Sequence, residues 1–239
     1  MDASLASLIA QAGPVPTQRK VAVAGATGLV GRCLVEQLCA DPSVAEVHAL
    51  VRRPLAVTPG THAKLVCHVV DFTALPALPA LDEVYLALGT TIKIAGSQER
   101  FRAVDFEANA SVASAALAAG ARRVGVVSAL AADARSSVFY SRVKGELEDA
   151  LRALPLTALM IARPSMLQGD RHALGQPERR GEQLWTRVDA WLRPIIPARF
   201  RAIAAADVAA ALVLTVPRLL GVQVLPSAQM QGAAGLAPR

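Results

Sequence analysis

Short apolar runs alternate with longer amphipathic stretches along most of this chain. The apolar runs predict buried strands at 20–24, 47–51, 64–70, 83–88, 124–127 and 156–162. Apolar positions with helical spacing predict helices at 29–39, 98–119 and 138–154. Strands separated by helices of this length indicate βαβ units, which are almost always right-handed crossovers. We therefore predict an α/β fold with a doubly wound parallel sheet.

The alternation weakens after Pro164. A loop at 169–181 and a helix at 183–192, with both tryptophans, predict a small C-terminal appendage on the substrate side of the domain at about 165–203. That helix can equally cap the sheet edge, with its tryptophans as core anchors. A helix at 204–216 and an edge strand at 222–225 follow. We expect one domain over 20–228, a flexible N-terminal arm at 1–19 and a mobile tail at 229–239.

Composition and charge narrow the possible partners. Of the 239 residues 53% are apolar, enough for one large core, and the net charge of +6 comes from dispersed arginines rather than a basic tract. Nucleic acid is therefore not an expected partner. The three cysteines are odd in number and lack metal-binding spacing, so we predict no metal site and a reducing setting.

Two apolar segments bear on localisation. Asp2 stands where a signal peptide carries basic residues, and the apolar run that follows is short. The late apolar stretch at 202–225 contains Asp207 and Pro217, which favours a buried helix over a bilayer span. We therefore predict a cytoplasmic protein without a membrane contact, either a monomer or a homodimer.

A glycine turn follows the first predicted strand. Gly25, Gly28 and Gly31 recur at every third residue, where a strand passes directly into a helix. Such a turn brings backbone close to a ligand, and the helix N-terminus offers free amides and a positive dipole end to a pyrophosphate. Taken alone, the glycine triplet also fits a plain βα turn.

The end of the second strand bears on the choice of dinucleotide. Arg52 lies 21 positions after Gly31, where an NAD site usually carries an acidic residue for the ribose 2′-hydroxyl. An arginine there accommodates a 2′-phosphate, so NADP(H) is favoured over NAD(H). Arg52 and Arg53 can alternatively be solvated residues of a turn.

Two further strand ends carry candidate cofactor contacts. Asp71 and Phe72 follow the third strand, where a carboxylate can accept a hydrogen bond from the adenine amine or simply cap the next turn. Leu88, Gly89 and Thr90 follow the fourth strand, where backbone can pass beneath the nicotinamide ribose or form a plain turn. All belong to one edge of the predicted sheet.

The start of the helix at 138–154 carries the candidate chemistry. Tyr140 and Lys144 lie four residues apart and hence on one helix face. A phenol is an inefficient acid or base near neutral pH, but a nearby ammonium favours the phenolate and makes proton transfer to a carbonyl oxygen feasible. Ser128, 12 residues earlier at a strand end, can donate a hydrogen bond to the same oxygen.

These motifs together resemble the short-chain dehydrogenase/reductase superfamily, with a Rossmann sheet. GATGLVG, LGTT, YSRVKGELE and ARPSMLQGDR are similar to its compact, atypical branch of NAD(P)-binding oxidoreductases, which includes the human Tat-interacting protein, over about residues 20–220. The resemblance implies that Tyr140 is the acid–base and that Lys144 binds the nicotinamide ribose. It assigns phosphate and ribose contacts to Gly25, Thr27, Gly28, Leu29 and Val30.

Three further features bear on what the resemblance implies. Asn109, in the long helix, can help a proton relay or simply be exposed. Ala129 and Leu130 follow Ser128 where many relatives carry hydroxyls, and the segment after Pro164 is short, which implies a small pocket. We expect an NADPH-dependent reductase of a small carbonyl or related substrate, with hydride from the nicotinamide and the proton from Tyr140. The alternative is an NADPH-binding sensor or scaffold that binds a protein partner without turnover.

Overall fold

The computed structural model describes residues 5, 9, 13–54, 63–168 and 201–236. Seven parallel strands form one sheet in the order β3-β2-β1-β4-β5-β6-β9. The strands are β1 (Arg19–Ala24), β2 (Val44–Val51), β3 (Leu65–Val69), β4 (Glu83–Leu86), β5 (Arg123–Val127), β6 (Ala158–Arg163) and β9 (Gly221–Pro226). The predicted doubly wound sheet is confirmed, and its strand order reverses between β1 and β4. Ligands of such sheets bind beyond the carboxyl ends of the strands at this reversal.

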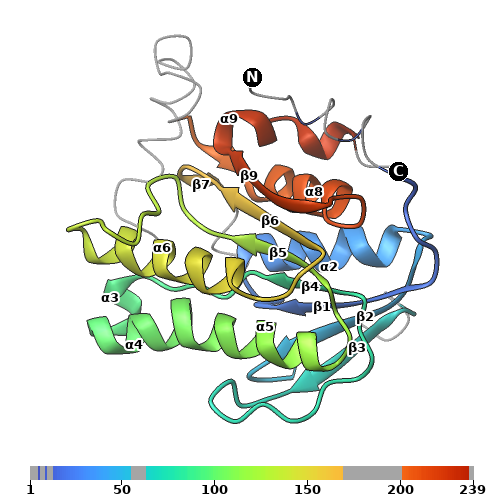
Figure 1. The fold of residues 1–239 in the computed structure, drawn as a ribbon, viewed down its shortest axis with the longest axis horizontal. Coiled ribbons are helices and arrows are strands. Elements are labelled where there is room, and N and C mark those ends of the chain that lie inside the picture. The colour runs from blue at the N-terminus through green and yellow to red at the C-terminus, as the bar shows by residue number, and fades with distance from the viewer. Residues whose placement is uncertain (1–4, 6–8, 10–12, 55–62, 169–200, 237–239) are drawn as a thin grey trace.

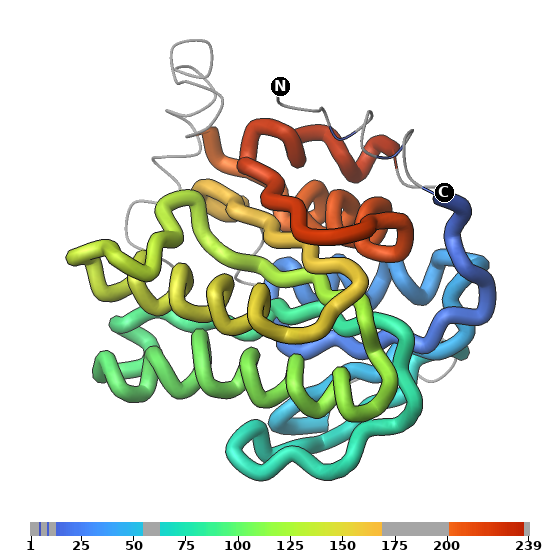
Figure 2. Tube along the Cα trace, viewed as in Figure 1, coloured from blue at the N-terminus to red at the C-terminus, as the bar shows by residue number. Residues whose placement is uncertain are grey.

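Helices cover both faces of the sheet, as Figures 1 and 2 show. On one face α2 (Leu29–Ala40) and α8 (Ala205–Thr215) bury leucines and valines against β1, β2 and β6. On the other face α5 (Asn109–Ala118) and α6 (Phe139–Arg152) pack on β4, β5 and β6. None of the described helices is long and apolar enough to cross a membrane.

The long helix predicted at 98–119 is interrupted. It consists of α4 (Gln98–Arg102), a π-helical turn η1 (Ala103–Ala108) and α5. Ser97 begins it, because its hydroxyl accepts a hydrogen bond from the Arg100 amide at 3.2 Å. Short α3 (Ile92–Ala95) precedes it, and a π turn within a helix is frequent at functional sites.

Some described residues within the predicted arm and tail are packed against the core. Leu5 lies in the core, and Arg19 is a buried part of β1 rather than the end of a flexible arm. At the other end, α9 (Ser227–Met230) and the 3-10 turn η4 (Ala233–Leu236) pack on α8 and bury Met230 and Ala233. Apolar residues of the tail therefore pack against the core. The polar and glycine residues around them gave no sign of this packing in the sequence.

The appendage is described only in part. Strands β7 (Leu167–Gln168) and β8 (Ile203–Ala204) form a separate two-stranded sheet at its two ends. The loop predicted at 169–181 and the helix predicted at 183–192, with Trp185 and Trp191, lie outside the described residues.

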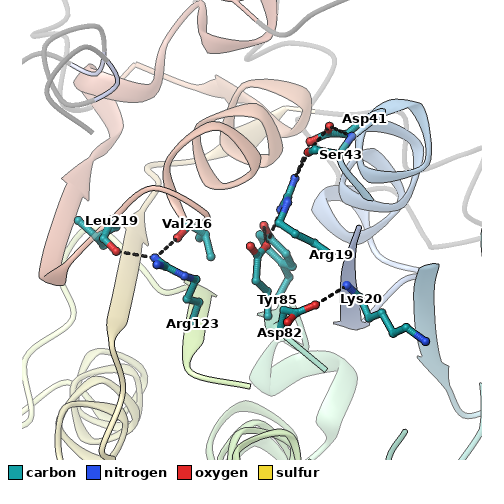
Figure 3. Close-up of polar contacts among 10 residues, drawn as sticks. Arg19, Lys20, Asp41, Ser43, Asp82, Tyr85, Arg123, Val216 and Leu219 are labelled. Carbon is teal, nitrogen blue, oxygen red and sulfur yellow. Dashed lines mark hydrogen bonds and ion pairs between the residues drawn. The ribbon is translucent and has the colours of Figure 1, made fainter. Parts of the chain in front are cut away.

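A buried polar network ties the amino-terminal edge of the main sheet together (Figure 3). Arg19 is 1% exposed and contacts Glu83 Oε2 at 2.7 Å, Asp41 Oδ2 at 2.7 Å and Ser43 Oγ at 2.8 Å. Tyr85 donates to the same Glu83 oxygen at 2.8 Å. Burial, followed by the Glu83 charge, raises the pKa of Tyr85 well above its ordinary value. The network joins β1, β4 and the turn that precedes β2.

Candidate functional site

The glycine turn follows β1 at the point where the strand order reverses. Gly25 has φ +89°, and a Cβ there would lie 2.4 Å from the Ala87 carbonyl oxygen of the loop after β4. A Cβ on Gly31 would lie 2.0 Å from the Gly25 carbonyl oxygen. Neither position accommodates a side chain, so the two glycines allow the first helix and the β4 loop to meet at the turn.

The N-terminus of α2 is open to a ligand. Gly28 is the N-cap residue and provides no side-chain hydrogen bond to the first helical amides. Those amides, together with the positive dipole end, suit a pyrophosphate. Thr27 is exposed and Leu29 is half-buried, whereas Val30 is buried and offers only its backbone. The geometry of the turn is compatible with a dinucleotide, and the individual contacts assigned to these positions stay predictions.

Arg52 lies directly after β2, the neighbour of β1. Its side chain is exposed and forms no hydrogen bond or ion pair with any residue that the structure describes. Arg53 is exposed as well. The carboxyl end of β2 therefore presents positive charge close to the glycine turn.

Asp71 and Phe72 follow β3, two strands from β1. Asp71 Oδ1 accepts hydrogen bonds from the Thr73 amide at 2.9 Å and the Thr73 hydroxyl at 2.7 Å. These bonds lower the pKa of Asp71 below its usual value. The capping role is thus present in the structure, and the adenine contact stays a prediction.

Two side chains from the long helix hold the loop after β4. Asp105 Oδ2 accepts a hydrogen bond from the Thr90 amide at 2.8 Å. Asn109 Nδ2 donates to the Leu88 carbonyl oxygen at 3.1 Å. The loop is therefore fixed on both sides of Gly89, and its backbone conformation depends on the π turn that carries Asp105.

Asn109 is buried rather than exposed. Its Nδ2 also contacts the Val104 and Asp105 carbonyl oxygens, each at 3.2 Å. The Oδ1 atom is buried without a hydrogen-bond partner among the described residues. The structure gives Asn109 a role in holding the loop, and its proposed part in a proton relay stays a prediction.

Lys144 is paired with a carboxylate that the sequence analysis missed. Its Nζ lies 2.6 Å from Asp105 Oδ1, and the two side chains are only 5% and 1% exposed. The one signal for Asp105 in the sequence is its place in VDFEAN, four residues before Asn109 and therefore on the same face of the long helix. That spacing alone does not distinguish a buried carboxylate from a solvated one.

Tyr140 is the second residue of α6, one turn before Lys144, so the predicted shared face is present. Its side chain is 38% exposed, and its ring lies 5.6 Å from the ring of Phe101. The hydroxyl group bonds to no described residue. A packed ring with an accessible hydroxyl is the arrangement that a proton donor to an external molecule needs.

Ser128 is directed elsewhere than expected. Its hydroxyl donates to Glu148 Oε1 at 2.5 Å, and Arg163 Nη2 contacts Glu148 Oε2 at 2.6 Å. Arg152 contacts the same carboxylate at 3.0 Å. Ser128, directly after β5, therefore bonds to the buried carboxylate of Glu148 on α6. The sequence analysis did not predict this pair. A contact between Ser128 and a substrate carbonyl would require this hydrogen bond to break.

The loop before α6 is clamped onto the helix at a glycine. A Cβ on Gly145 would lie 2.1 Å from the Ala134 amide nitrogen. The Asp133 amide donates to the Ser141 carbonyl oxygen at 3.0 Å. The absence of a side chain at Gly145 therefore lets the loop at 133–134 pack directly on α6, near Tyr140.

Comparison with known proteins supports the dinucleotide site. A family model described as NAD(P)H-binding matches residues 25–216. The mitochondrial protein fmp52 of Emericella nidulans is 35% identical over 158 residues, which are 63% of this chain and 68% of the relative. The FMP52 protein of Candida albicans is 32% identical over 182 residues, 73% and 79% of the two chains.

Solved structures share the fold at low identity. An oxidoreductase of the short-chain dehydrogenase/reductase family from Burkholderia thailandensis has a TM-score of 0.66 at 20% identity, with 92% of this chain and 96% of that one covered. MoeE5, in complex with UDP-glucose and NAD, has a TM-score of 0.62 at 20% identity, with 86% and 75% covered. The compact branch suggested by the sequence motifs is not singled out by these similarities and stays a prediction.

The relatives contradict one prediction. Both fungal proteins are named mitochondrial, so the expectation of a cytoplasmic protein is wrong as it stands. Unpaired thiols indicate a reducing environment, and that property does not identify a compartment.

The family assignment rests on two agreeing observations. The matched region begins at Gly25 and includes the open N-terminus of α2, the loop after β4 and the Tyr140–Lys144 face of α6. The glycine turn lies where the strand order of the sheet reverses, as dinucleotide sites of this fold do. This chain belongs to the NAD(P)H-binding family.

Proposed function

We propose that the protein is an NADP(H)-dependent oxidoreductase of the short-chain type that reduces a small carbonyl compound. The observation that carries the proposal is partly exposed Tyr140, whose hydroxyl bonds to no described residue, one turn from buried Lys144 and at the same sheet edge as the glycine turn. A nicotinamide, when bound, supplies a hydride for the carbonyl carbon.

The residues of the chain supply the remaining functions. Tyr140 gives its proton to the carbonyl oxygen as the hydride reaches the carbon, and it regains a proton from solvent. The Lys144 charge favours the phenolate that Tyr140 forms in this step. Gly25, Gly28 and the first amides of α2 hold the pyrophosphate, and the loop at 88–90 lies beneath the nicotinamide ribose.

Oxidation of NADPH by a panel of aldehydes and ketones tests the proposal directly. Binding is first measured through the fluorescence of the reduced nicotinamide, and turnover is then followed by its absorbance. Tight NADPH binding with substrate-dependent oxidation supports the proposal. Tight binding with no oxidation across the panel rejects the reductase and supports the alternative below.

The preference for NADP(H) rests on Arg52. Because Arg52 has no ion-pair partner among the described residues, its charge is available to a 2′-phosphate. Arg52→Ala should weaken NADPH binding by about 10- to 100-fold, the loss expected for a charge-assisted hydrogen bond, and leave NADH binding nearly unchanged. Arg53→Ala is the matched control. Equal weakening of NADPH and NADH by Arg52→Ala would reject the phosphate contact.

A second candidate function is an NADPH-binding sensor or scaffold that binds a protein partner. The bond between Ser128 and Glu148 favours it, because it removes a hydroxyl donor from the substrate side. Ala129 and Leu130, which lack hydroxyls, favour it as well. Substrate recognition is assigned to residues 165–203, a proposal that the described part of that segment leaves untested.

A further inference from the structure

Asp105 joins the two halves of the proposed site. It is the third residue of the π turn η1 and is 1% exposed. One carboxylate oxygen lies 2.6 Å from Lys144 Nζ, and the other accepts the hydrogen bond from the Thr90 amide at 2.8 Å. A single side chain thus connects α6, which carries Tyr140, with the loop after β4.

The burial of Lys144 makes a counter-charge necessary. An ammonium that is almost fully removed from water is strongly disfavoured unless an anion compensates it. On its own helix, Tyr140 and Glu148 lie one turn before and one turn after Lys144. Glu148 is already engaged by Arg152, Arg163 and the Ser128 hydroxyl.

No second carboxylate among the described residues pairs with Lys144. Glu146 of α6 pairs with Arg102 of α4, and the backbone of Gly89 faces Lys144 from the β4 loop without a charge. Among the residues that the structure describes, Asp105 is the one carboxylate in ion-pair contact with Lys144.

We propose that Asp105 is a positioning residue that compensates the buried charge of Lys144 and directs it toward the loop at 88–90. The proposal rests on the proposed function for its catalytic meaning, because the Lys144 charge acts on Tyr140. Asn109 completes the arrangement from the next turn of the helix, where it holds the Leu88 carbonyl oxygen on the other side of Gly89.

The test begins with thermal unfolding of the cofactor-free protein. Asp105→Asn keeps an oxygen for the Thr90 amide, and it replaces the charged oxygen that faces Lys144 with an uncharged amide NH2 group. We expect Tm to fall by about 10 °C near neutral pH, since breaking a buried pair leaves an uncompensated charge. The deficit should narrow toward about pH 9.5, because the folded variant then binds fewer protons than its unfolded chain and gains stability as pH rises.

Two companion variants sharpen the result. Lys144→Met leaves Asp105 as the uncompensated group, so its deficit should grow as pH rises, opposite to that of Asp105→Asn. The double variant should recover most of the Tm lost in either single variant. A deficit that is independent of pH, together with additive losses in the double variant, would show that Asp105 serves only as a hydrogen-bond acceptor for Thr90.

A functional measurement separates this inference from the proposed function. With a carbonyl substrate in hand, Asp105→Asn should lose turnover at alkaline pH, where the wild-type protein retains it, and Asp105→Glu should restore part of that range. A pH profile identical to wild type would contradict the role of Asp105 at the site. If no carbonyl is reduced at all, the proposed function fails, and the unfolding data still decide whether Asp105 holds the charge of Lys144.

Discussion

The two edges of the main sheet both contain buried charge, and they use it differently. At the amino-terminal edge Arg19 has carboxylate partners on two sides, and the Tyr85 hydroxyl is bonded to Glu83 (Figure 3). At the carboxyl edge Lys144 has one partner, and the Tyr140 hydroxyl has none among the described residues.

The two edges differ in whether their polar groups bond to other protein groups or remain accessible to a ligand. The Arg19 network is buried, and its groups bond mainly to one another; Arg19 Nε and Glu83 Oε1 are buried without a hydrogen-bond partner among the described residues, where a ligand does not reach them. The carboxyl edge leaves the Arg52 side chain, the first amides of α2 and the Tyr140 hydroxyl available. The two edges therefore differ in whether their unpaired polar groups are accessible, and accessible groups at a strand-order reversal favour the carboxyl edge as the candidate ligand-binding edge.

The largest expected effect on stability lies at the amino-terminal edge. Arg19→Met leaves Glu83 and Asp41 without their cation and should cost about 3–5 kcal/mol of unfolding free energy. NADPH affinity of the folded protein should stay within about twofold, because the network lies at the opposite edge. Chemical denaturation and nicotinamide fluorescence provide the two measurements.

Lys20, the next residue after Arg19, provides the matched control. Lys20 pairs with Glu46 at the surface, where both side chains are about 40% exposed, so Lys20→Met should cost less than about 1 kcal/mol. If Arg19→Met abolished NADPH binding in protein that is still folded, the two edges would not be independent.

A smaller expected effect lies at the glycine turn. Gly31→Ala places a Cβ against the Gly25 carbonyl oxygen, a backbone atom that cannot rotate away. We expect NADPH affinity to fall by about 100-fold, or about 2.7 kcal/mol. Gly28→Ala, where the nearest atom lies 3.3 Å from the added Cβ, should lose clearly less. Wild-type affinity in Gly31→Ala would remove the turn from the binding site.

Most of the fold could be predicted from local sequence. Apolar runs of strand length recur between amphipathic helices, and each main-sheet strand is buried by helices on its two faces except at the margins. The alternation of apolar strands with amphipathic helices was therefore sufficient to predict the parallel sheet. The burial of the tail was not predicted, because Met230 and Ala233 lie outside any regular apolar pattern and pack near α8, which ends 15 or more residues earlier in the sequence.

The candidate site was predicted only where a motif is local. The glycine turn and the Tyr140–Lys144 spacing depend on short sequence intervals; the structure places the glycines at the turn after β1 and Tyr140 one helical turn before Lys144, and their functional roles stay predictions. Asp105 and Glu148 were missed because their partners, Lys144 and Ser128, lie on other elements. A π turn, which directs Asp105 inward, has no simple periodicity in the sequence.

The two tyrosines of the chain provide the most direct test of the account. Tyr85 belongs to the Arg19 network at the amino-terminal edge, and Tyr140 lies at the carboxyl edge. Tyr140→Phe should reduce turnover by at least about 100-fold, with Tm and NADPH affinity nearly unchanged. Tyr85→Phe should cost about 1–3 kcal/mol of stability and leave the turnover of folded protein intact. Parallel measurement of Tm and NADPH oxidation in both variants decides the matter, and unchanged turnover in Tyr140→Phe would contradict the proposed catalytic edge.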